Sequence, residues 1–219
     1  MIINKLNVIV NEIQQKIKEL NISKPVPKII AVSKTFGMSE ILPLIKHGHL
    51  HFGENKVQES VEKWTDIKTD FKNIKLHMLG KIQTNKAKYV VDLFDYIHSL
   101  DNKKLAEKIS KEQEKKNKKL KIFIQVNIAN EDQKAGVSVE NLDDFYFYCV
   151  QELKLDIIGL MCLPPHNEKR EGYFKKMNDL KDILQLDDLS MGMSGDYLEA
   201  VKYGSTFVRI GSKLFGQRY

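Results

Sequence analysis

The sequence predicts an α/β protein that folds as a single (β/α)8 barrel, or TIM barrel, with an extra N-terminal helix. Eight short apolar runs alternate with segments of helical periodicity, which is the pattern of βαβ units around a parallel sheet. No linker, proline-rich break or low-complexity segment divides residues 1–219, so we expect one domain. A doubly wound open sheet is the alternative. The eight predicted strands favour the barrel, although 219 residues is short for one.

The elements are expected in strict alternation. Residues 1–23 have apolar positions spaced as on one face of a helix, and we expect this helix to pack on the barrel. The predicted strands are short and mostly continuous apolar runs, as buried parallel strands are: Lys28–Ser33, Leu50–Phe52, Lys75–Leu79, Tyr96–Ser99, Lys121–Asn127, Asp156–Leu160, Asp188–Ser190 and Thr206–Ile210. Helices are predicted between them at Ser39–His47, Asn55–Trp64, Thr84–Asp92, Lys103–Lys116, Val139–Gln151, Glu168–Leu184 and Gly195–Tyr203.

The charge pattern does not favour a nucleic-acid partner. The net charge is +6, but only three of the 35 basic residues are arginine, and the lysines are spread along the chain. Dispersed lysines give non-specific attraction at most. No apolar run approaches the roughly 20 residues of a membrane span, and the N-terminus lacks the continuous apolar block of a signal peptide.

The two cysteines, Cys149 and Cys162, lie in segments that we expect to be buried. They form no disulfide framework, which fits a reducing compartment. We therefore expect a cytoplasmic protein that binds neither membranes nor nucleic acid.

Lys34 is the first candidate for chemistry, because it directly follows the predicted strand KIIAVS. In a barrel, functional groups lie on the loops past the C-terminal ends of the strands. A lysine there can simply extend its ammonium group into solvent along a packed stem. Alternatively, partial burial lowers the pKa of the amine, so that it attacks a carbonyl carbon and forms a Schiff base.

Two loops that contain glycine and serine follow the last two predicted strands. The first is LSMGMSGD at residues 189–196, and the second is VRIGSKLFG at residues 208–216, where Gly211 and Ser212 begin a helix or turn. Glycine lets the backbone approach a ligand, and a helix N-terminus presents N–H groups to an anion. Each loop alone is consistent with an ordinary turn. Together, after strands seven and eight, they predict a phosphate site.

Three further side chains each have two interpretations. Arg209, in the eighth strand, is either a salt-bridge partner at the rim or a permanently charged donor aimed into the barrel mouth. Asn55 is either a helix N-cap or a polar lining group. His77, on the third strand, is either a satisfied core histidine or part of a site.

Two polar segments remain. His47, His49 and His51 form the pattern H-x-H-x-H, but no cysteine or carboxylate set completes a metal site, so no metal is expected. Lys134 lies in a polar loop after the fifth strand, and its role stays open.

These motifs, taken in order, resemble a known family. The residues that carry the resemblance are AVSKT, HFGENKVQE, H-x-L-G-x-x-Q-x-N-K, QVN-x-x-x-E-x-x-K-x-G, GLM and LSMGMS-x-D followed by GST-x-VRIG-x-x-x-FG. The chain resembles the pyridoxal 5′-phosphate homeostasis proteins of the YggS/PROSC type from Ile30 to Arg218. Any one motif alone is weak, but several uncommon ones coincide with predicted strand ends.

The resemblance implies the fold of the barrel domain of bacterial alanine racemase, standing alone, with bound pyridoxal 5′-phosphate. Lys34 matches the lysine that forms the internal aldimine, and Arg209 matches the arginine that faces the pyridine nitrogen. The resemblance assigns the phosphate to Met193, Ser194, Gly211 and Ser212, and it places Asn55 and His77 near the cofactor. The chain departs from the family at Phe36-Gly37 and Leu76, where Lys-Pro or Phe-Pro and tryptophan are often found.

The function implied is intracellular homeostasis or delivery of pyridoxal 5′-phosphate without evident catalysis. A guanidinium only donates, so opposite the ring nitrogen it keeps that nitrogen unprotonated and weakens the cofactor as an electron sink. This alone does not exclude an enzyme, because racemases of the related fold resemble the same arrangement. The similar racemases also have a second domain, whereas only Tyr219 follows Arg218 here. A pyridoxal phosphate-dependent racemase or lyase is the alternative, and a barrel enzyme acting on sugar phosphates is the third. Apoenzymes that use the cofactor are the expected partners of a monomer or weak dimer.

Overall fold

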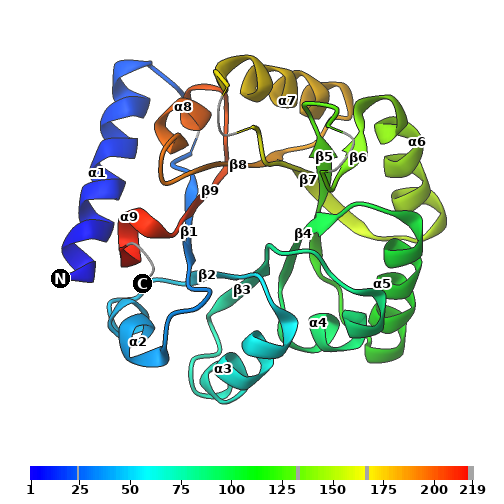
Figure 1. Ribbon diagram of the computed structural model, residues 1–219, viewed down its shortest axis with the longest axis horizontal. Helices are drawn as coiled ribbons and strands as arrows, with labels where there is room; N and C mark the ends of the chain where they lie inside the picture. The colour runs from blue at the N-terminus through cyan, green and yellow to red at the C-terminus, as the bar shows by residue number, and fades with distance from the viewer. Residues whose placement is uncertain (24, 132–133, 166–167, 217–219) are drawn as a thin grey trace.

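Figure 1 presents a computed structural model of the chain, which describes residues 1–23, 25–131, 134–165 and 168–216. Within them, parallel strands close into a barrel in the order β1-β2-β3-β4-β5-β7-β8-β9, with β9 pairing back onto β1. The strands are β1 (Lys28–Val32), β2 (His51–Glu54), β3 (Lys75–Met78), β4 (Tyr96–Leu100), β5 (Lys121–Asn127), β6 (Val137–Ser138), β7 (Asp156–Cys162), β8 (Asp188–Met193) and β9 (Phe207–Ile210). The predicted barrel is confirmed, and the closing pairs exclude the open sheet.

Helices surround this barrel (Figure 1). They are α1 (Ile2–Glu19), α2 (Met38–Lys46), α3 (Val57–Asp70), α4 (Ala87–Leu93), α5 (Lys103–Lys116), α6 (Leu142–Phe147), α7 (Glu171–Ile183), α8 (Tyr197–Lys202) and α9 (Ser212–Phe215). Short turns of helix at Thr84–Lys86, Val139–Asn141 and Tyr148–Glu152 adjoin α4 and α6. None of the described helices is long and apolar enough to cross a membrane.

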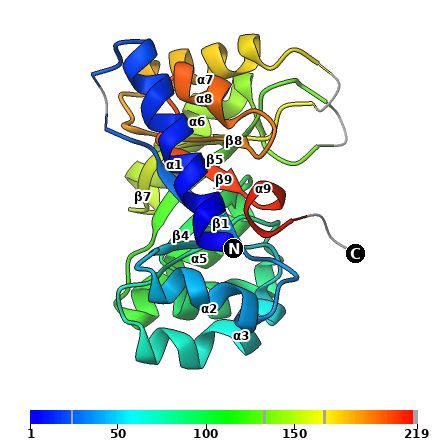
Figure 2. The ribbon, with the colours of Figure 1, turned by 90° about the vertical axis from the view of Figure 1, so that its left-hand side faces the viewer.

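The N-terminal helix α1 lies beside α8 and α9 and crosses the side of the barrel (Figure 2). Its apolar face buries Leu6, Ile9 and Ile13 at the spacing of one helical stripe. On its polar face, the Glu12 carboxylate accepts a hydrogen bond from Lys213 Nζ at 2.6 Å and another from the Tyr197 hydroxyl. The helix is therefore tied to the two elements that follow β8 and β9.

Two apolar clusters form the core, because alternate strand residues point to opposite sides of the sheet. The larger cluster lies between the strands and the helices and includes the fully buried Trp64. The smaller one comprises Ile30, Tyr96, Phe123, Met161 and Phe207. These five residues come from five different strands, so we place this cluster inside the barrel.

Parallel register brings the ends of sequence-distant strands to one mouth. Ile30 on β1 pairs with Arg209 on β9, and Val32 pairs with Gly53 on β2. The residues that follow β1, β2, β8 and β9 therefore share one end of the barrel, as expected from the fold. This arrangement positions the site.

The structure corrects several predicted boundaries. Strand β2 continues to Glu54 and α3 begins only at Val57, so Asn55 lies between them, outside the helix predicted there. Strands β7 and β8 extend past the predicted ends, to Cys162 and Met193. The two-residue strand β6 was not predicted, because it lies outside the barrel and pairs only with the end of β5. Arg218, where the resemblance ends, lies outside the described residues.

Candidate functional site

A cavity of about 910 Å³ opens at the C-terminal ends of the barrel strands. This size falls within the usual range of small-molecule sites. Seven of the eight predicted site residues line it: Lys34, Asn55, Met193, Ser194, Arg209, Gly211 and Ser212. The other lining residues are Val32, Phe36, Leu79, Gln125, Val126, Asn127, Lys134, Ala135, Met161, Leu163, Pro164, Arg170, Gly195 and Gly216.

The ionisable side chains on this wall are all cationic. Lys34, Lys134, Arg170 and Arg209 line the cavity, together with neutral amides and Ser194 and Ser212 hydroxyls. A concave wall of one charge sign attracts ligands of the opposite sign. The cavity is therefore suited to an anionic small molecule.

Lys34 follows Ser33, two residues past the end of β1, and is half-buried at the mouth. The next residue, Thr35, has a φ of 69°. A β-branched residue in this left-handed region is strained and persists only where neighbours hold it. Here the Thr35 N–H donates to Glu59 Oε1 on α3 at 2.7 Å. The turn that carries Lys34 is thus fastened to the helix after β2.

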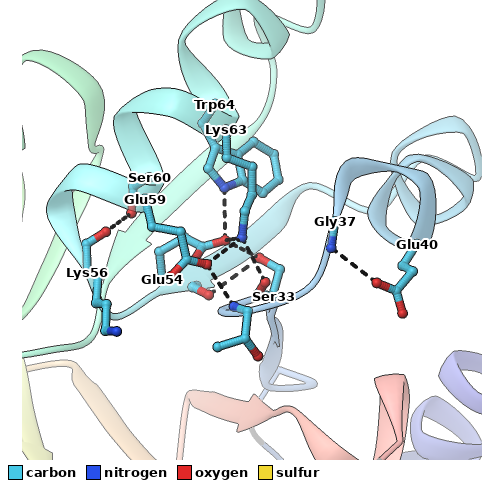
Figure 3. Close-up of polar contacts among 11 residues, drawn as sticks. Ser33, Gly37, Glu40, Glu54, Lys56, Glu59, Ser60, Lys63 and Trp64 are labelled. Carbon is cyan, nitrogen blue, oxygen red and sulfur yellow. Dashed lines mark hydrogen bonds and ion pairs between the residues drawn. The ribbon is translucent and has the colours of Figure 1, made fainter. Parts of the chain in front are cut away.

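Figure 3 shows the polar network behind this turn. Lys63 Nζ donates to the Ser33 carbonyl at 3.0 Å, and also to Glu54 Oε1 at 3.1 Å and Glu59 Oε1 at 2.9 Å. Glu54 Oε1 also accepts hydrogen bonds from the Ser33 hydroxyl and from the indole N–H of Trp64. One lysine therefore joins the end of β1, the end of β2 and helix α3.

Glu54 is fully buried, and burial raises the pKa of its carboxyl, while Trp64 and Lys63 act in the opposite direction. Its second oxygen, Oε2, has no hydrogen-bond partner within the described part of the chain. A buried carboxylate in this position depends strongly on its cationic neighbour Lys63.

The two loops predicted to hold a phosphate meet at the mouth. The Ser194 hydroxyl, after β8, accepts hydrogen bonds from the backbone N–H groups of Gly211 and Lys213, after β9, each at 3.3 Å. Gly192 has a φ of 91°, and an added Cβ there would lie 2.6 Å from that of Ala200. Only glycine fits this irregular position near the end of β8 without strain. These hydrogen bonds thus join the two loops at the cavity wall.

Arg209 is 5% exposed, and its guanidinium is held by three hydrogen bonds. Nη1 donates to the Ser190 carbonyl at 2.6 Å and to the Ser190 hydroxyl at 2.7 Å, and Nη2 donates to the Cys162 carbonyl at 2.9 Å. Burial lowers the pKa of Arg209, but a guanidinium stays charged in proteins. Of the two interpretations, these contacts favour a cation fixed against the cavity over a salt bridge at the rim.

Asn55 lines the cavity and caps no helix, since α3 begins after Lys56 without a side-chain cap. Its backbone packs against Gly80 in the loop after β3. A Cβ added to Gly80 would lie 2.1 Å from the Asn55 carbonyl oxygen. The GEN and HMLG motifs therefore meet through this backbone contact.

We expect Gly80→Ala to lower the free energy of unfolding by about 1–3 kcal/mol, because the Asn55 backbone must move to admit the methyl group. Denaturant unfolding measures this change. Gly195→Ala is the matched control at the same mouth, since nothing lies within 4 Å of a Cβ there. We expect that control to change stability by less than about 0.5 kcal/mol. Equal effects of the two substitutions would contradict this account of Gly80.

The structure does not bring His77 to the cavity. This side chain is fully buried and bonds to two other histidines, with its Nε2 at 2.9 Å from His51 Nδ1 and its Nδ1 at 2.9 Å from His98 Nε2. His77 also stacks on Tyr96 of the inner cluster. The interpretation as a satisfied core histidine describes these contacts. In the described ranges, no group of three or more His, Cys, Asp or Glu side chains is placed to hold a metal ion.

Sequence reasoning left several lining residues without a role. Gln125, Asn127 and Arg170 line the cavity, and Arg170 also pairs with Asp196 in the loop after β8. Asn127 ends β5, so its place at a strand end is a signal that could have marked it. Arg170 precedes a helix far from any predicted strand end, and nothing in its local sequence indicates the cavity. The departure at Phe36 has a structural role, since its ring stacks on Phe215 at 4.7 Å.

Both cysteines are buried, as expected. Burial raises the pKa of each thiol to about 12. Such thiols are poor nucleophiles at neutral pH. Neither cysteine lines the cavity.

The fold and the cavity define a class: an eight-stranded parallel barrel that presents a lysine, an arginine and two loops containing glycine and serine at one mouth. The chain belongs to the family described as alanine racemase, N-terminal domain, whose model matches residues 8–219. This confirms the family implied by the sequence motifs.

Curated relatives named pyridoxal phosphate homeostasis protein match along nearly the whole chain. The Aquifex aeolicus protein is 36% identical over 98% of this chain and 97% of its own length. The Haemophilus influenzae protein is also 36% identical, over 98% of this chain and 95% of its own length. The resemblance to the homeostasis proteins is thus confirmed.

Solved structures show the same fold. PipY of Synechococcus elongatus with pyridoxal phosphate bound superposes with a TM-score of 0.81 at 32% identity, over 93% of this chain and all of that one. Alanine racemase from Corynebacterium glutamicum superposes with a TM-score of 0.66 at 15% identity, over 95% of this chain and 62% of that chain. The second likeness shows the barrel fold alone.

Proposed function

We propose that this protein binds pyridoxal 5′-phosphate as a Schiff base on Lys34 and serves to hold the cofactor and deliver it to apoenzymes inside the cell. The observation that carries the proposal is one cavity that joins Lys34, Arg209 and the paired loops at Ser194 and Gly211. The homology to homeostasis proteins and to a structure with bound pyridoxal phosphate supports the same ligand.

The loops suit the phosphate group. The Ser194 and Ser212 hydroxyls, and the backbone N–H of Ser212 at the start of α9, are the kinds of donor that hold a phosphate without a metal. Lys213 lies next to Ser212 in the short helix α9, and its ammonium group forms an ion pair with Glu12 of α1. The positive cavity wall supplies the complementary charge.

Lys34 suits the aldehyde. Its amine would attack the aldehyde carbon, form a C=N bond and release the aldehyde oxygen as one water molecule. The bond reverses by the same route, so a recipient protein with its own lysine can take over the cofactor. The turn at Thr35 and the network around Lys63 keep Lys34 at the mouth.

Arg209 suits the ring nitrogen and argues for a carrier. Bound pyridoxal phosphate supplies an electron sink to enzymes when its ring nitrogen is protonated. A guanidinium donates a hydrogen bond to that nitrogen and thereby opposes its protonation. The cavity that presents Arg209 favours storage of the cofactor over carbanion chemistry.

The visible absorbance of the protein mixed with pyridoxal phosphate tests the proposal. Wild-type protein is expected to develop Schiff-base absorbance, and borohydride reduction should attach the ligand to the peptide that contains Lys34. Lys34→Ala should abolish both signals. Lys81→Ala, at an exposed lysine after β3, is the control and should retain both. Absence of Schiff-base absorbance in the wild type, or its persistence in Lys34→Ala, would refute the covalent site.

Exchange of α-protons separates the carrier from a racemase or lyase. The loaded protein is incubated with each amino acid in deuterated water and followed by NMR. We expect no exchange faster than that of pyridoxal phosphate free in solution. Rapid exchange with one amino acid would contradict the carrier function while leaving cofactor binding intact.

A further inference from the structure

An unbroken chain of hydrogen bonds runs through the inside of the barrel and ends at Arg209. His51 Nδ1 lies 2.9 Å from His77 Nε2, and His77 Nδ1 lies 2.9 Å from His98 Nε2. His98 Nδ1 lies 2.8 Å from the Ser190 hydroxyl, which accepts from Arg209 Nη1 at 2.7 Å. The members come from β2, β3, β4, β8 and β9. Apart from the half-buried His51, all are buried.

The number of N–H and O–H donors determines which atom donates in each hydrogen bond of this series. Arg209 only donates, so the Ser190 oxygen is the acceptor in that bond. A serine oxygen can accept two hydrogen bonds, but if His98 Nδ1 also donated to it, the buried hydroxyl hydrogen would have no acceptor among the described residues. The hydroxyl therefore donates to His98 Nδ1. A neutral imidazole has one N–H, so the His98 proton is on Nε2 and is donated to His77 Nδ1. The same step places the His77 proton on Nε2, directed to His51 Nδ1.

The surroundings favour the neutral rings that this count requires. Burial holds the pKa of His77 and of His98 well below the ordinary value, and the Arg209 charge acts in the same direction on His98. A cationic His98 would also direct an N–H at the Ser190 oxygen beside Arg209 and displace the hydroxyl hydrogen. His98 stacks on Phe123 at 4.3 Å, which fixes the plane of its ring.

We propose that Ser190, His98 and His77 are positioning residues for Arg209. Each histidine is neutral and protonated on Nε2, and the chain keeps the lone pairs of the Ser190 oxygen turned toward the guanidinium. This inference rests on the proposed function, in which Arg209 faces the ring nitrogen of the ligand. The hydrogen-bond chain does not transfer protons to the cavity, because a guanidinium accepts no proton. Its effect is to fix an orientation.

Nitrogen-15 NMR of the histidine rings tests the hydrogen-bond chain in the protein without bound ligand. At neutral pH, His77 and His98 are each expected to show one protonated nitrogen, Nε2, with Nδ1 unprotonated. A ring of either residue protonated on Nδ1, or on both nitrogens, would overturn the proposal. This result does not depend on whether the protein binds pyridoxal phosphate.

Two substitutions of His98 separate positioning from packing. In His98→Asn, the side-chain oxygen can take the place of Nδ1 and accept from Ser190, while the link to His77 is lost. In His98→Gln, the amide lies near the place of Nε2, so Ser190 loses its acceptor. Both substitutions remove the stack on Phe123. We expect His98→Gln to weaken binding of pyridoxal phosphate by roughly ten- to hundredfold, and His98→Asn by less than about threefold.

The pH dependence of the bound ligand's visible spectrum is the second readout. His98→Gln should shift the pH at which the spectrum changes, because a displaced guanidinium no longer opposes protonation of the ring nitrogen. His98→Asn and Ser205→Ala should keep the wild-type profile. Ser205 is a buried serine whose hydroxyl donates to the Met191 carbonyl at 2.7 Å and serves as the packing control.

The outcomes distinguish the two proposals. Equal loss of affinity in both His98 variants, with unshifted spectra, would show a packing role and overturn the inference. If wild-type protein takes up no pyridoxal phosphate, the proposed function fails. The histidine tautomers measured by NMR still decide whether the hydrogen-bond chain exists.

Discussion

Acidification from pH 7 to pH 5 is expected to lower the free energy of unfolding by up to about 4 kcal/mol through His77 and His98 alone. Both rings are fully buried, and burial holds the pKa of each well below its value of about 6.5 in an unfolded chain. Below pH 6.5 the unfolded state therefore binds a proton at each histidine that the folded state does not. Stability is fully present above that pH and is lost as the pH falls.

Each such histidine contributes a slope of roughly 1.4 kcal/mol per pH unit, or about 2 kcal/mol between pH 6.5 and pH 5. His51 acts in the same direction, since burial lowers its pKa to about 4. Glu54 acts in the opposite direction, because its raised pKa favours protonation in the folded state. For a domain with a total stability of about 5–15 kcal/mol, the histidines make acid sensitivity a dominant property.

Urea unfolding at pH 7, 6 and 5 measures this dependence. His77→Gln is expected to reduce the slope by about one histidine's share. His47→Gln is the control, because His47 is exposed at the end of α2 and lies outside the chain of rings. A His77→Gln variant with the wild-type slope would contradict the assignment of the acid sensitivity to the barrel interior.

Lys63→Met is expected to lower the free energy of unfolding by about 3–5 kcal/mol. Lys63 is the cation that contacts the fully buried Glu54, at 3.1 Å, and its side chain is itself only 11% exposed. Without it, the carboxylate either stays charged without compensation or takes up a proton, and both states are costly. The Ser33 carbonyl beside Lys34 also loses its donor.

A second substitution gives this prediction its control. In Lys63→Met/Glu54→Gln, the neutral amide oxygen can still accept from Trp64 and Ser33, so most of the lost stability should return. Lys16→Met removes an exposed ion pair with Glu19 and should cost less than about 0.5 kcal/mol. Thermal or urea unfolding of the variants decides between these results. If the single variant Lys63→Met is no less stable than Lys16→Met, the role of Lys63 is refuted.

Local patterns in the sequence predicted the barrel well, because each buried strand is a run of apolar residues that are consecutive in the sequence. Lys121–Asn127 and Lys103–Lys116 match the structure residue for residue. The end of β2 was placed too early because Gly53 interrupts the apolar run, whereas β8 continues past its predicted end at Ser190 through Met191 and Gly192. In the structure these glycines continue the strands, since each has close neighbours that exclude a side chain.

The site was predicted where it depends on strand ends, and missed where it depends on contacts between distant segments. Lys34 and the loops near Ser194 and Gly211 lie within two residues of strand ends, so their position can be predicted from their order along the chain. The association of Lys63 with Glu54 and of His98 with Ser190 forms only when the barrel closes. His77 shares a motif with the site, but the alternation of strand side chains turns it into the barrel interior.

Because β9 pairs with β1, the barrel can close only after β9 has been synthesised. Lys34 leaves the ribosome early, whereas Arg209 and the Gly211 loop emerge among the last residues of the barrel. Contacts between such distant segments form late in folding. A nascent chain therefore carries Lys34 without the groups that lie across the cavity from it until β9 has been made. The cavity becomes complete only when the last strand closes the ring.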